Sequence, residues 1–258
     1  MLMKNADVNW GEFDPYIYLK QYYEIILDSD REIVANLVKF YKKNQPNGRF
    51  LEVGCGPNLF PVFAALPYVD NIDIVEFGEK NISYLKQQFV SFHNIWLQWI
   101  DLLKKLDPVY KNIDFNQCFR QKVVINQDNI FDLPQNKYEA VSMHFVAECL
   151  TGDVNEFYEA NKKFIESIKP GGIFFASFME NSQGYDSPGK PFPAVAIEAD
   201  HIRESIGFLS KDLNIQKIKS GPGIIKTIHT GILIASGHKD KITKTSLTEL
   251  FTPLLQAS

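Results

Sequence analysis

The chain has 258 residues, is 45% hydrophobic, 22% charged and 13% aromatic, and carries a formal net charge of −4 at pH 7, which is the composition of a folded globular protein. The negative charge and the lack of a Lys/Arg cluster argue against a nucleic-acid partner, and no run reaches the roughly 18 apolar residues of a membrane-spanning helix. Three widely spaced cysteines and the lack of a secretory leader pattern predict a cytoplasmic protein with reduced thiols and no membrane partner.

The first 45 residues are predicted to form two helices. Apolar and aromatic side chains recur there at helical spacing, from Phe13 to Phe40. Because these helices precede the first strand-like run, we expect residues 1–45 to form a helical lid over an active site. Residues 46–240 would then form the main domain and residues 241–258 a C-terminal tail.

Strand-like runs alternate with helical or turn-rich stretches through the main domain. The runs are nearly continuous in apolar residues, which is typical of strands buried on both faces of a parallel sheet. They cover residues 49–53, 71–77, 122–126, 139–146 and 172–179, and two more follow a helix near 199–210, at about 214–219 and 231–237. We therefore predict an α/β fold with a Rossmann-like, doubly wound, mostly parallel seven-stranded sheet and helices on both faces.

Three segments lie outside this alternation. Residues 91–121 form an insertion that is predicted to begin as a helix. The polar, Pro- and Gly-rich segment 181–193 is predicted to be a surface loop. The tail contains SLTELFTPLL (246–255), which predicts a short amphipathic helix packed on the domain and interrupted by Pro253.

The first strand-like run ends in LEVGCGPN (51–58). Gly54 and Gly56 allow a sharp turn and a close approach of the backbone to a ligand, at the strand end where doubly wound sheets bind ligands. A dinucleotide site would have a third glycine where Leu59 stands, so a nucleoside without a pyrophosphate is favoured. Glu76, 20 residues after Gly56, is placed to accept hydrogen bonds from both ribose hydroxyls.

The third strand-like run is followed by QDNIF (127–131). Asp128 is placed to accept a hydrogen bond from an adenine amino group, with Ile130 and Phe131 against the ring; the alternative is a solvated aspartate in a turn. The segment IKPGG (168–172) connects a helix to the fifth strand and carries no chemistry.

These motifs together resemble a known family. LEVGCGP, the acidic end of the second strand, the aspartate after the third and KPGG are similar to those of class I S-adenosyl-L-methionine-dependent methyltransferases. FDPYIYLKQYY (13–23) resembles the N-terminal signature of the nicotinamide, phenylethanolamine and thioether (indolethylamine) methyltransferases. The resemblance runs from Phe13 to Lys239 and implies N-methylation of a small amine or N-heteroaromatic acceptor, with S-adenosyl-L-methionine as cofactor. We expect a monomer or a homodimer.

The resemblance also implies which residues form the site. Tyr18, Tyr22 and Tyr23 would fold over the cofactor and acceptor, with Tyr22 beside the reaction, although aromatic residues at helical spacing also fit a plain core. The implied cofactor-binding residues are Tyr18, Tyr23, Gly54, Cys55, Gly56, Glu76, Phe77, Asn81, Asp128 and Asn129.

On the acceptor side, Glu148 in HFVAECLT resembles the family's functional glutamate and could neutralise an ammonium or accept its proton; the alternative is a surface glutamate beside a helix. Glu180 and Tyr185 are expected to face the substrate. His229 is a further candidate, with a solvated turn histidine as the alternative.

The departures from the family concern three positions. The aspartate and serine that hold the nicotinamide carboxamide correspond to Phe178 and Ala194, and the acid that holds the amine of phenylethanolamine corresponds to Ile228. Neither acceptor is therefore expected.

Other readings of the site remain open. An attack on the aminocarboxypropyl arm of the cofactor would release methylthioadenosine, and a non-catalytic nucleoside-binding protein would keep only the donor site. His144 and Glu148 lie four residues apart, but two ligands in a segment that begins as a strand are weak grounds for a metal, and none is expected. Cys55 has no base nearby in the sequence and is read as a small residue between two glycines.

Overall fold

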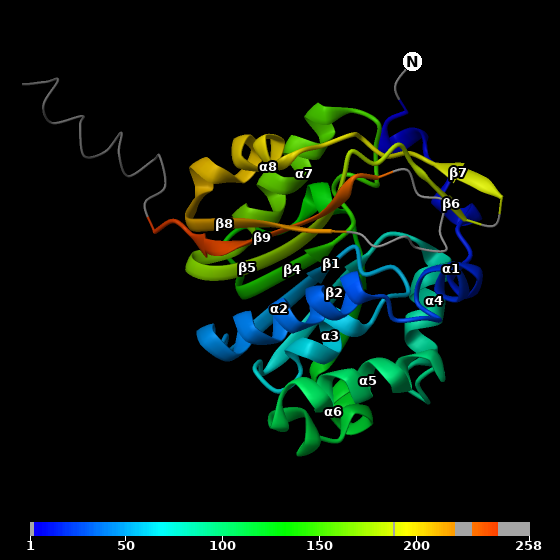
Figure 1. Ribbon diagram of the computed structural model, residues 1–258, viewed down its shortest axis with the longest axis vertical. Helices are drawn as coiled ribbons and strands as arrows, with labels where there is room; N and C mark the ends of the chain where they lie inside the picture. Colours follow the sequence, from blue (N-terminus) through cyan, green and yellow to red (C-terminus); the bar gives the residue numbers. More distant parts are fainter. Residues whose placement is uncertain (1–2, 188, 220–228, 242–258) are drawn as a thin grey trace, which may run out of the picture.

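The computed structural model describes residues 3–187, 189–219 and 229–241. Its main sheet has seven strands in the order β3-β2-β1-β4-β5-β9-β8 (Figure 1). Neighbouring strands in the part β3-β2-β1-β4-β5 pair in parallel, whereas β9 pairs antiparallel with both β5 and β8. The predicted doubly wound, mostly parallel α/β fold is confirmed. The strands are β1 (Arg49–Val53), β2 (Asn71–Glu76), β3 (Val123–Gln127), β4 (Tyr138–His144), β5 (Ile168–Glu180), β8 (Ser210–Ile218) and β9 (Gly231–Lys239).

Several strand boundaries differ from the prediction by one to four residues, and two of these differences bear on the site. β4 ends at His144 instead of residue 146, because Phe145 adopts a positive φ of 58° and leaves the strand. β5 begins at Ile168, which pairs with Tyr138; the KPGG segment that follows lies in a register shift, and regular pairing with β4 resumes where Ile173 pairs with Ala140. The end of β4 therefore turns into a loop, and this turn lies at the edge of the sheet where the pocket is found.

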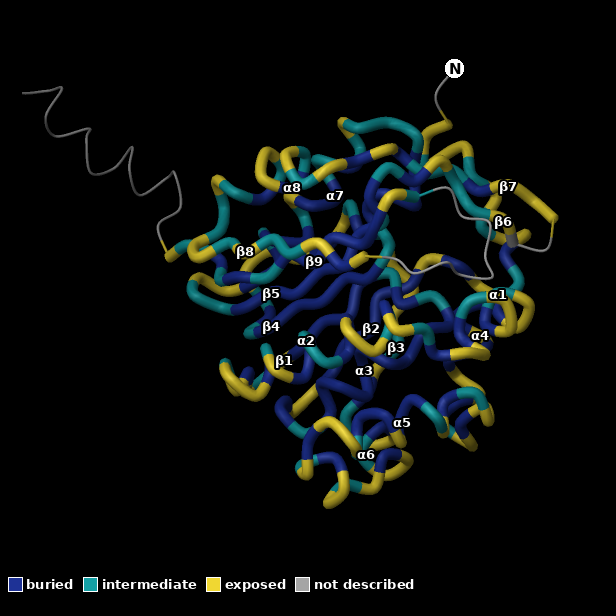
Figure 2. The backbone as a smooth tube through the Cα atoms, viewed as in Figure 1, coloured by how far each residue is buried: buried dark blue, intermediate teal, exposed yellow. Residues whose placement is uncertain are grey.

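Helices cover both faces of the sheet, and the strands send alternate side chains to each face. Phe50 packs on one side and Leu51 on the other. The first side carries α2 (Asp28–Asn44), α3 (Phe60–Ala65), α4 (Glu79–Gln87), α5 (Ile95–Leu106) and α6 (Phe115–Lys122), and the second side carries α7 (Val154–Glu166) and α8 (Ala199–Ile206). Figure 2 shows the central strands β1 and β4 buried between these layers.

The N-terminal segment contains the two predicted helices. α1 (Pro15–Tyr22) starts where the Asp14 carboxylate accepts hydrogen bonds from the Tyr16 and Ile17 amides, with proline at the first helical position. Two short 3₁₀ turns precede it, at Asn5–Asp7 and Trp10–Glu12.

The start of this segment is fixed to the region before and within α7. The Gly152 amide donates to the Met3 carbonyl at 2.7 Å, and the Asn5 amide donates to Glu156 Oε2 at 2.9 Å. The segment that joins this anchor to α1 lines the pocket described below.

The insertion after α4 is helical as predicted and forms α5, a 3₁₀ turn (Pro108–Lys111) and α6. The polar segment 181–193 is more ordered than predicted: β6 (Tyr185–Ser187) and β7 (Lys190–Phe192) form a two-stranded hairpin. The predicted tail helix and Ile228 lie outside the described residues. Among the described residues, no helix is both long and apolar enough to cross a membrane.

Candidate active site

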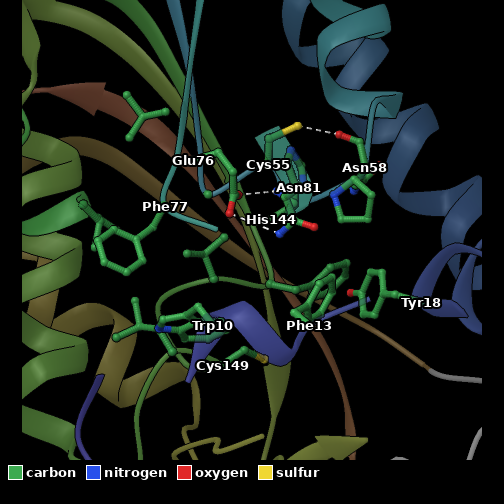
Figure 3. A pocket seen from close by; sticks show the side chains of 18 of the residues that line it. Trp10, Phe13, Tyr18, Cys55, Asn58, Glu76, Phe77, Asn81, His144 and Cys149 are labelled. Carbon is green, nitrogen blue, oxygen red and sulfur yellow. Dashed lines mark hydrogen bonds between the residues drawn. The ribbon is translucent and has the colours of Figure 1, made fainter. Parts of the chain in front are cut away.

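A pocket lies at the carboxyl ends of β1, β2 and β4 (Figure 3), and its empty space, counted together with the open solvent at its mouth, is about 990 Å³. All of the predicted cofactor-binding residues line it, together with Tyr22 and Tyr185. Glu148, Glu180 and His229 do not belong to its lining. Glu76 and Cys55 lie on one side of the pocket in Figure 3, and Trp10 and Tyr18 lie across from them.

The turn after β1 requires glycine at its first position. Gly54 has a φ of +61°, and a Cβ built on it would lie 2.6 Å from Val146 Cγ1. Gly56 also has a positive φ of +56°, but a Cβ there would meet only the Asn81 amide nitrogen, at 3.9 Å. The first glycine therefore lets the loop after β4 pack against the turn, and the second gives the backbone its direction.

The Glu76 carboxylate is held at the end of β2 by three donors. Its Oε2 accepts from the Gly56 amide at 2.7 Å, and its Oε1 accepts from the Gly78 amide at 2.8 Å and from Asn81 Nδ2 at 3.1 Å. Burial raises the pKa of Glu76, and these hydrogen bonds oppose that shift. A carboxylate offers about four acceptor sites, so capacity for a further hydrogen bond is left on Oε2.

The segment after β3 forms the outer rim of the pocket. Asp128 is exposed, and its Oδ1 accepts from the Asn129 amide at 2.8 Å. The Phe77 side chain, 52% exposed, lies on the same rim. Ile130 lines the pocket as predicted, whereas Phe131 does not and instead packs against the core on the α7 side of the sheet.

Cys55 and Asn58 connect the turn to the N-terminal helices. Cys55 Sγ donates to the Asn58 carbonyl at 2.6 Å, and Asn58 Nδ2 donates to Tyr23 Oη at 3.1 Å. Burial raises the pKa of the Cys55 thiol well above its usual value, which does not suit a nucleophile. Asn58 lines the pocket but was not predicted, and its only signal in the sequence is its position directly after the glycine turn.

The opposite side of the pocket is built from rings. Tyr18 lies between the rings of Phe13, Tyr22, Tyr23 and Tyr185, at centroid distances of 4.9, 4.7, 5.8 and 6.5 Å.

Hairpin side chains join these rings to the N-terminal segment. Phe192 stacks on Trp10 at 5.6 Å and on Tyr185 at 5.3 Å, and Tyr22 Oη donates to the Asp186 carbonyl at 3.3 Å. We call Trp10, Phe13, Tyr18, Tyr22, Tyr185 and Phe192 the aromatic cluster. Tyr18, Tyr22 and Tyr23 pack in or against the core, as the alternative of a plain core expects, and they also line the pocket.

Glu148 lies directly behind the pocket wall. It is 0% exposed, and its Oε1 accepts from the Met179 amide at 2.8 Å. Its Oε2 has no hydrogen-bond partner among the described residues, and burial raises the pKa of the carboxyl to about 7. Its neighbours Cys149 and Met179 line the pocket. The alternative of a surface glutamate is wrong.

His144, at the end of β4, also lines the pocket. Its Nδ1 lies 3.0 Å from Ser177 Oγ, and burial lowers the pKa of the imidazole to about 3. Within the described parts of the chain, no three His, Cys, Asp or Glu side chains are grouped so that they could hold a metal ion.

Two candidates for the acceptor side lie elsewhere. Glu180 accepts a hydrogen bond from Thr230 and pairs with Lys217; burial raises its pKa, but these partners more than offset that and hold the pKa below its usual range. His229 Nδ1 lies 3.2 Å from the Gly231 carbonyl. Because side chains alternate along a strand, Met179 faces the pocket and Glu180 faces away from it.

Two of the three positions used to compare acceptors, Phe178 and Ala194, are also outside the pocket lining. Phe178 is fully buried, and its ring packs against Phe157 at a centroid distance of 5.9 Å. Ala194 does not line the pocket either. The departures from the family pattern at these two positions therefore do not change the lining of the pocket.

A scan against models of protein families matches residues 3–239 to the NNMT/PNMT/TEMT family. No curated protein sequence matches the chain at the significance required. Among solved structures, the fold is similar to the N-methyltransferase NodS from Bradyrhizobium japonicum WM9 in complex with S-adenosyl-L-homocysteine, with a TM-score of 0.56 and 11% identity over 88% of this chain and 98% of that one.

Two further structures have a similar fold. The DhpI–SAH complex gives a TM-score of 0.56 at 12% identity over 87% of this chain and 91% of that one. An S-adenosylmethionine-dependent methyltransferase from Clostridium acetobutylicum ATCC 824 gives 0.52 at 13% identity over 85% and 96%. At these identities the likeness concerns the fold alone.

Proposed function

Since the chain belongs to the NNMT/PNMT/TEMT family and is a class I S-adenosyl-L-methionine-dependent methyltransferase, we propose that it methylates a nitrogen atom of a small amine or N-heteroaromatic acceptor. The observation that carries the proposal is a single pocket that joins two different walls. One wall has the glycine turn and the Glu76 carboxylate, and the other has the aromatic cluster, in which Phe192 supports the rings that line the pocket. NodS, which has a similar fold, is described as an N-methyltransferase.

The residues of the first wall fit the cofactor. The turn at Gly54 and Gly56 leaves backbone without side chains beside the proposed methionine arm. Glu76 Oε2 keeps capacity for one ribose hydroxyl; accepting the second as well would displace the Gly56 amide, since three acceptor sites are already used. Asp128, exposed on the rim with one oxygen bound by its neighbour, is proposed to accept from the adenine amino group.

The aromatic cluster is proposed to exclude water and orient the acceptor. When bound, the cofactor supplies a methyl group on a positively charged sulfur, which a nucleophile takes by in-line displacement. Aromatic faces attract such a cation, and holding reactants in line lowers a barrier by up to roughly 7 to 11 kcal/mol. No nucleophilic side chain is needed, in keeping with the buried thiol of Cys55.

Glu148 is proposed as the acid–base group of the acceptor side. Its Oε2 is free of partners within the described residues, and a pKa of about 7 leaves a large fraction ionised at neutral pH. Because the carboxyl lies behind Cys149 and Met179, we propose that it offsets the charge of an amine acceptor from just outside the pocket lining, or receives the acceptor's proton through a bridging water.

Product analysis tests the proposal. The purified protein is incubated with S-adenosyl-L-methionine, with and without a pool of small amines and N-heterocycles, and nucleosides are identified by chromatography and mass spectrometry. S-adenosylhomocysteine that forms only with acceptors, together with an N-methyl signal in the product, would support it. Methylthioadenosine formed without any acceptor would overturn it in favour of attack on the aminocarboxypropyl arm, and binding without turnover would favour a nucleoside-binding protein.

A further inference from the structure

His144 lines the pocket. Its ring nitrogen Nε2 is buried and has no hydrogen-bond partner among the described residues. The His144 side chain is 6% exposed. Its ring packs edge-on against Phe60 at a centroid distance of 5.2 Å and lies 5.8 Å from Phe175. These contacts and the bond at Nδ1 fix the direction of the imidazole.

The hydrogen bond to Ser177 determines which ring nitrogen carries the proton. Ser177 is fully buried. Among the described residues, its hydroxyl has one hydrogen-bond partner, His144 Nδ1, at 3.0 Å. If Nδ1 carried the proton, the serine hydroxyl hydrogen and the Nε2 lone pair would both be buried without partners, whereas with the proton on Nε2 only the Nε2–H lacks one. The hydroxyl therefore donates to Nδ1, and the proton of the neutral ring is on Nε2.

The buried environment also sets the charge of this donor. Burial lowers the pKa of His144 to about 3, so the ring is neutral at physiological pH. A neutral N–H offers a hydrogen bond without placing a positive charge beside a sulfonium cofactor, which a protonated imidazole would repel.

The position of the ring indicates which part of a ligand it would meet. Phe60, which contacts the ring of His144, follows Gly56 by four residues, so the imidazole ring lies near the glycine turn, on the side of the pocket assigned above to the methionine arm. The adenine side, at Asp128, belongs to the rim after β3.

We propose that His144 Nε2–H donates a hydrogen bond to an oxygen lone pair of a bound ligand, first of all the carboxylate of the methionine arm, or otherwise an oxygen of the methyl acceptor. This inference rests on the proposed function and assigns a binding role to a residue that the mechanism above does not use. A buried donor without a partner is unfavourable, and a ligand oxygen at this point would remove that penalty.

Calorimetry with two nucleosides tests the carboxylate as the source. S-adenosylhomocysteine carries the carboxylate, and 5′-methylthioadenosine lacks it. We expect His144→Phe to weaken binding of the first by about 10-fold or more, because the partner is charged, and to leave the second within about two-fold. His144→Gln, which keeps an N–H donor, should recover most of the lost affinity. His93 is an exposed histidine outside the pocket, and His93→Gln should leave the affinity for S-adenosylhomocysteine unchanged.

Steady-state kinetics tests the acceptor as the source. If His144→Phe leaves S-adenosylhomocysteine affinity unchanged but raises the acceptor KM by about 10-fold, the lone pair belongs to the acceptor. If neither quantity changes, the proposal is overturned.

Nitrogen-15 NMR of the histidine rings gives a readout that does not depend on the reaction. The ring should be neutral with its proton on Nε2, and a proton on Nδ1 would overturn the inference. Ser177→Ala, which keeps the imidazole in place, should shift this tautomer balance and weaken the binding of S-adenosylhomocysteine by a few-fold. This variant therefore tests the proposal even if His144→Phe does not fold. Failure of the proposed function would instead show in the wild-type protein, as no S-adenosylhomocysteine formed with any acceptor.

Discussion

The two walls of the pocket are built in different ways. The wall that contains the glycine turn and Glu76, which we call the nucleoside wall after its proposed ligand, comes from the ends of neighbouring parallel strands. Backbone amides hold its main side chain, Glu76, in place. The aromatic cluster comes from the N-terminal segment and the β6–β7 hairpin, which lie outside the seven-stranded sheet and meet through ring contacts. The first wall is suited to hold one ligand of fixed shape, and the second is suited to enclose and orient a variable one. Changes in the first should therefore alter affinity, and changes on the acceptor side should alter rate.

The largest expected effect is on the acceptor side. Glu148→Gln keeps the shape of the side chain and removes its titration. We expect kcat to fall by about 10²- to 10⁴-fold. The affinity for S-adenosylhomocysteine, measured by calorimetry, should stay within about two-fold of wild type. A base acts when deprotonated, so wild-type kcat should rise with pH around an apparent midpoint near 7, and the variant should lose that rise. An unchanged kcat would remove Glu148 from the mechanism and break the division between the two walls.

The next effect concerns stability at the turn of the nucleoside wall. Gly54→Ala adds a Cβ at 2.6 Å from Val146 to a residue with positive φ, and we expect a loss of about 2 to 4 kcal/mol in the free energy of unfolding. Gly56→Ala is the matched control, since its Cβ has space and only the backbone strain of about 1 to 2 kcal/mol remains. Denaturant unfolding measures both, and equal losses would contradict the close packing of the loop after β4.

Removing the charge at the end of β2 should reduce affinity without changing the acceptor side. Glu76→Gln replaces a carboxylate that three donors hold toward the pocket, and we expect S-adenosylhomocysteine to bind about 10- to 100-fold more weakly by calorimetry. Asp128→Asn, on the exposed rim, should weaken binding by only a few-fold. An affinity unchanged in Glu76→Gln would refute the ribose assignment.

The smallest effect is expected outside both walls. Glu180 pairs with Lys217 and Thr230 and faces away from the pocket, so Glu180→Gln should leave kcat and KM within about two-fold of wild type. Steady-state kinetics with the acceptor identified above measures this. A ten-fold rise in KM would return Glu180 to the acceptor side and would mean that the pocket extends beyond its present lining.

The nucleoside wall could be predicted because its signals are local. Gly54, Gly56 and Asp128 come shortly after strand-like runs, Glu76 stands at the end of one, and parallel strands bring their carboxyl ends to one edge of the sheet. Their roles remain proposals, but the structure brings all of them to one pocket.

The acceptor side was less accessible to sequence reasoning because it depends on contacts between distant segments. The sequence predicts a loop where the hairpin lies, since prolines and glycines hide the pairing of Tyr185 with Phe192. It predicts Glu180 in the site because it does not say which face of a strand each residue occupies, and Met179 lines the pocket instead.

The location of the aromatic cluster has a consequence for how the protein can change over generations. Its rings belong to segments that add nothing to the pairing of the seven central strands, so substitutions there can alter acceptor preference while that pairing is inherited intact. The glycine turn and the strand ends have less freedom, because Gly54 packs against Val146 and three donors of the scaffold hold Glu76. Drift toward a new acceptor would therefore be recorded in the first 22 residues and the hairpin, and a laboratory selection for new acceptors could confine its libraries to these two segments.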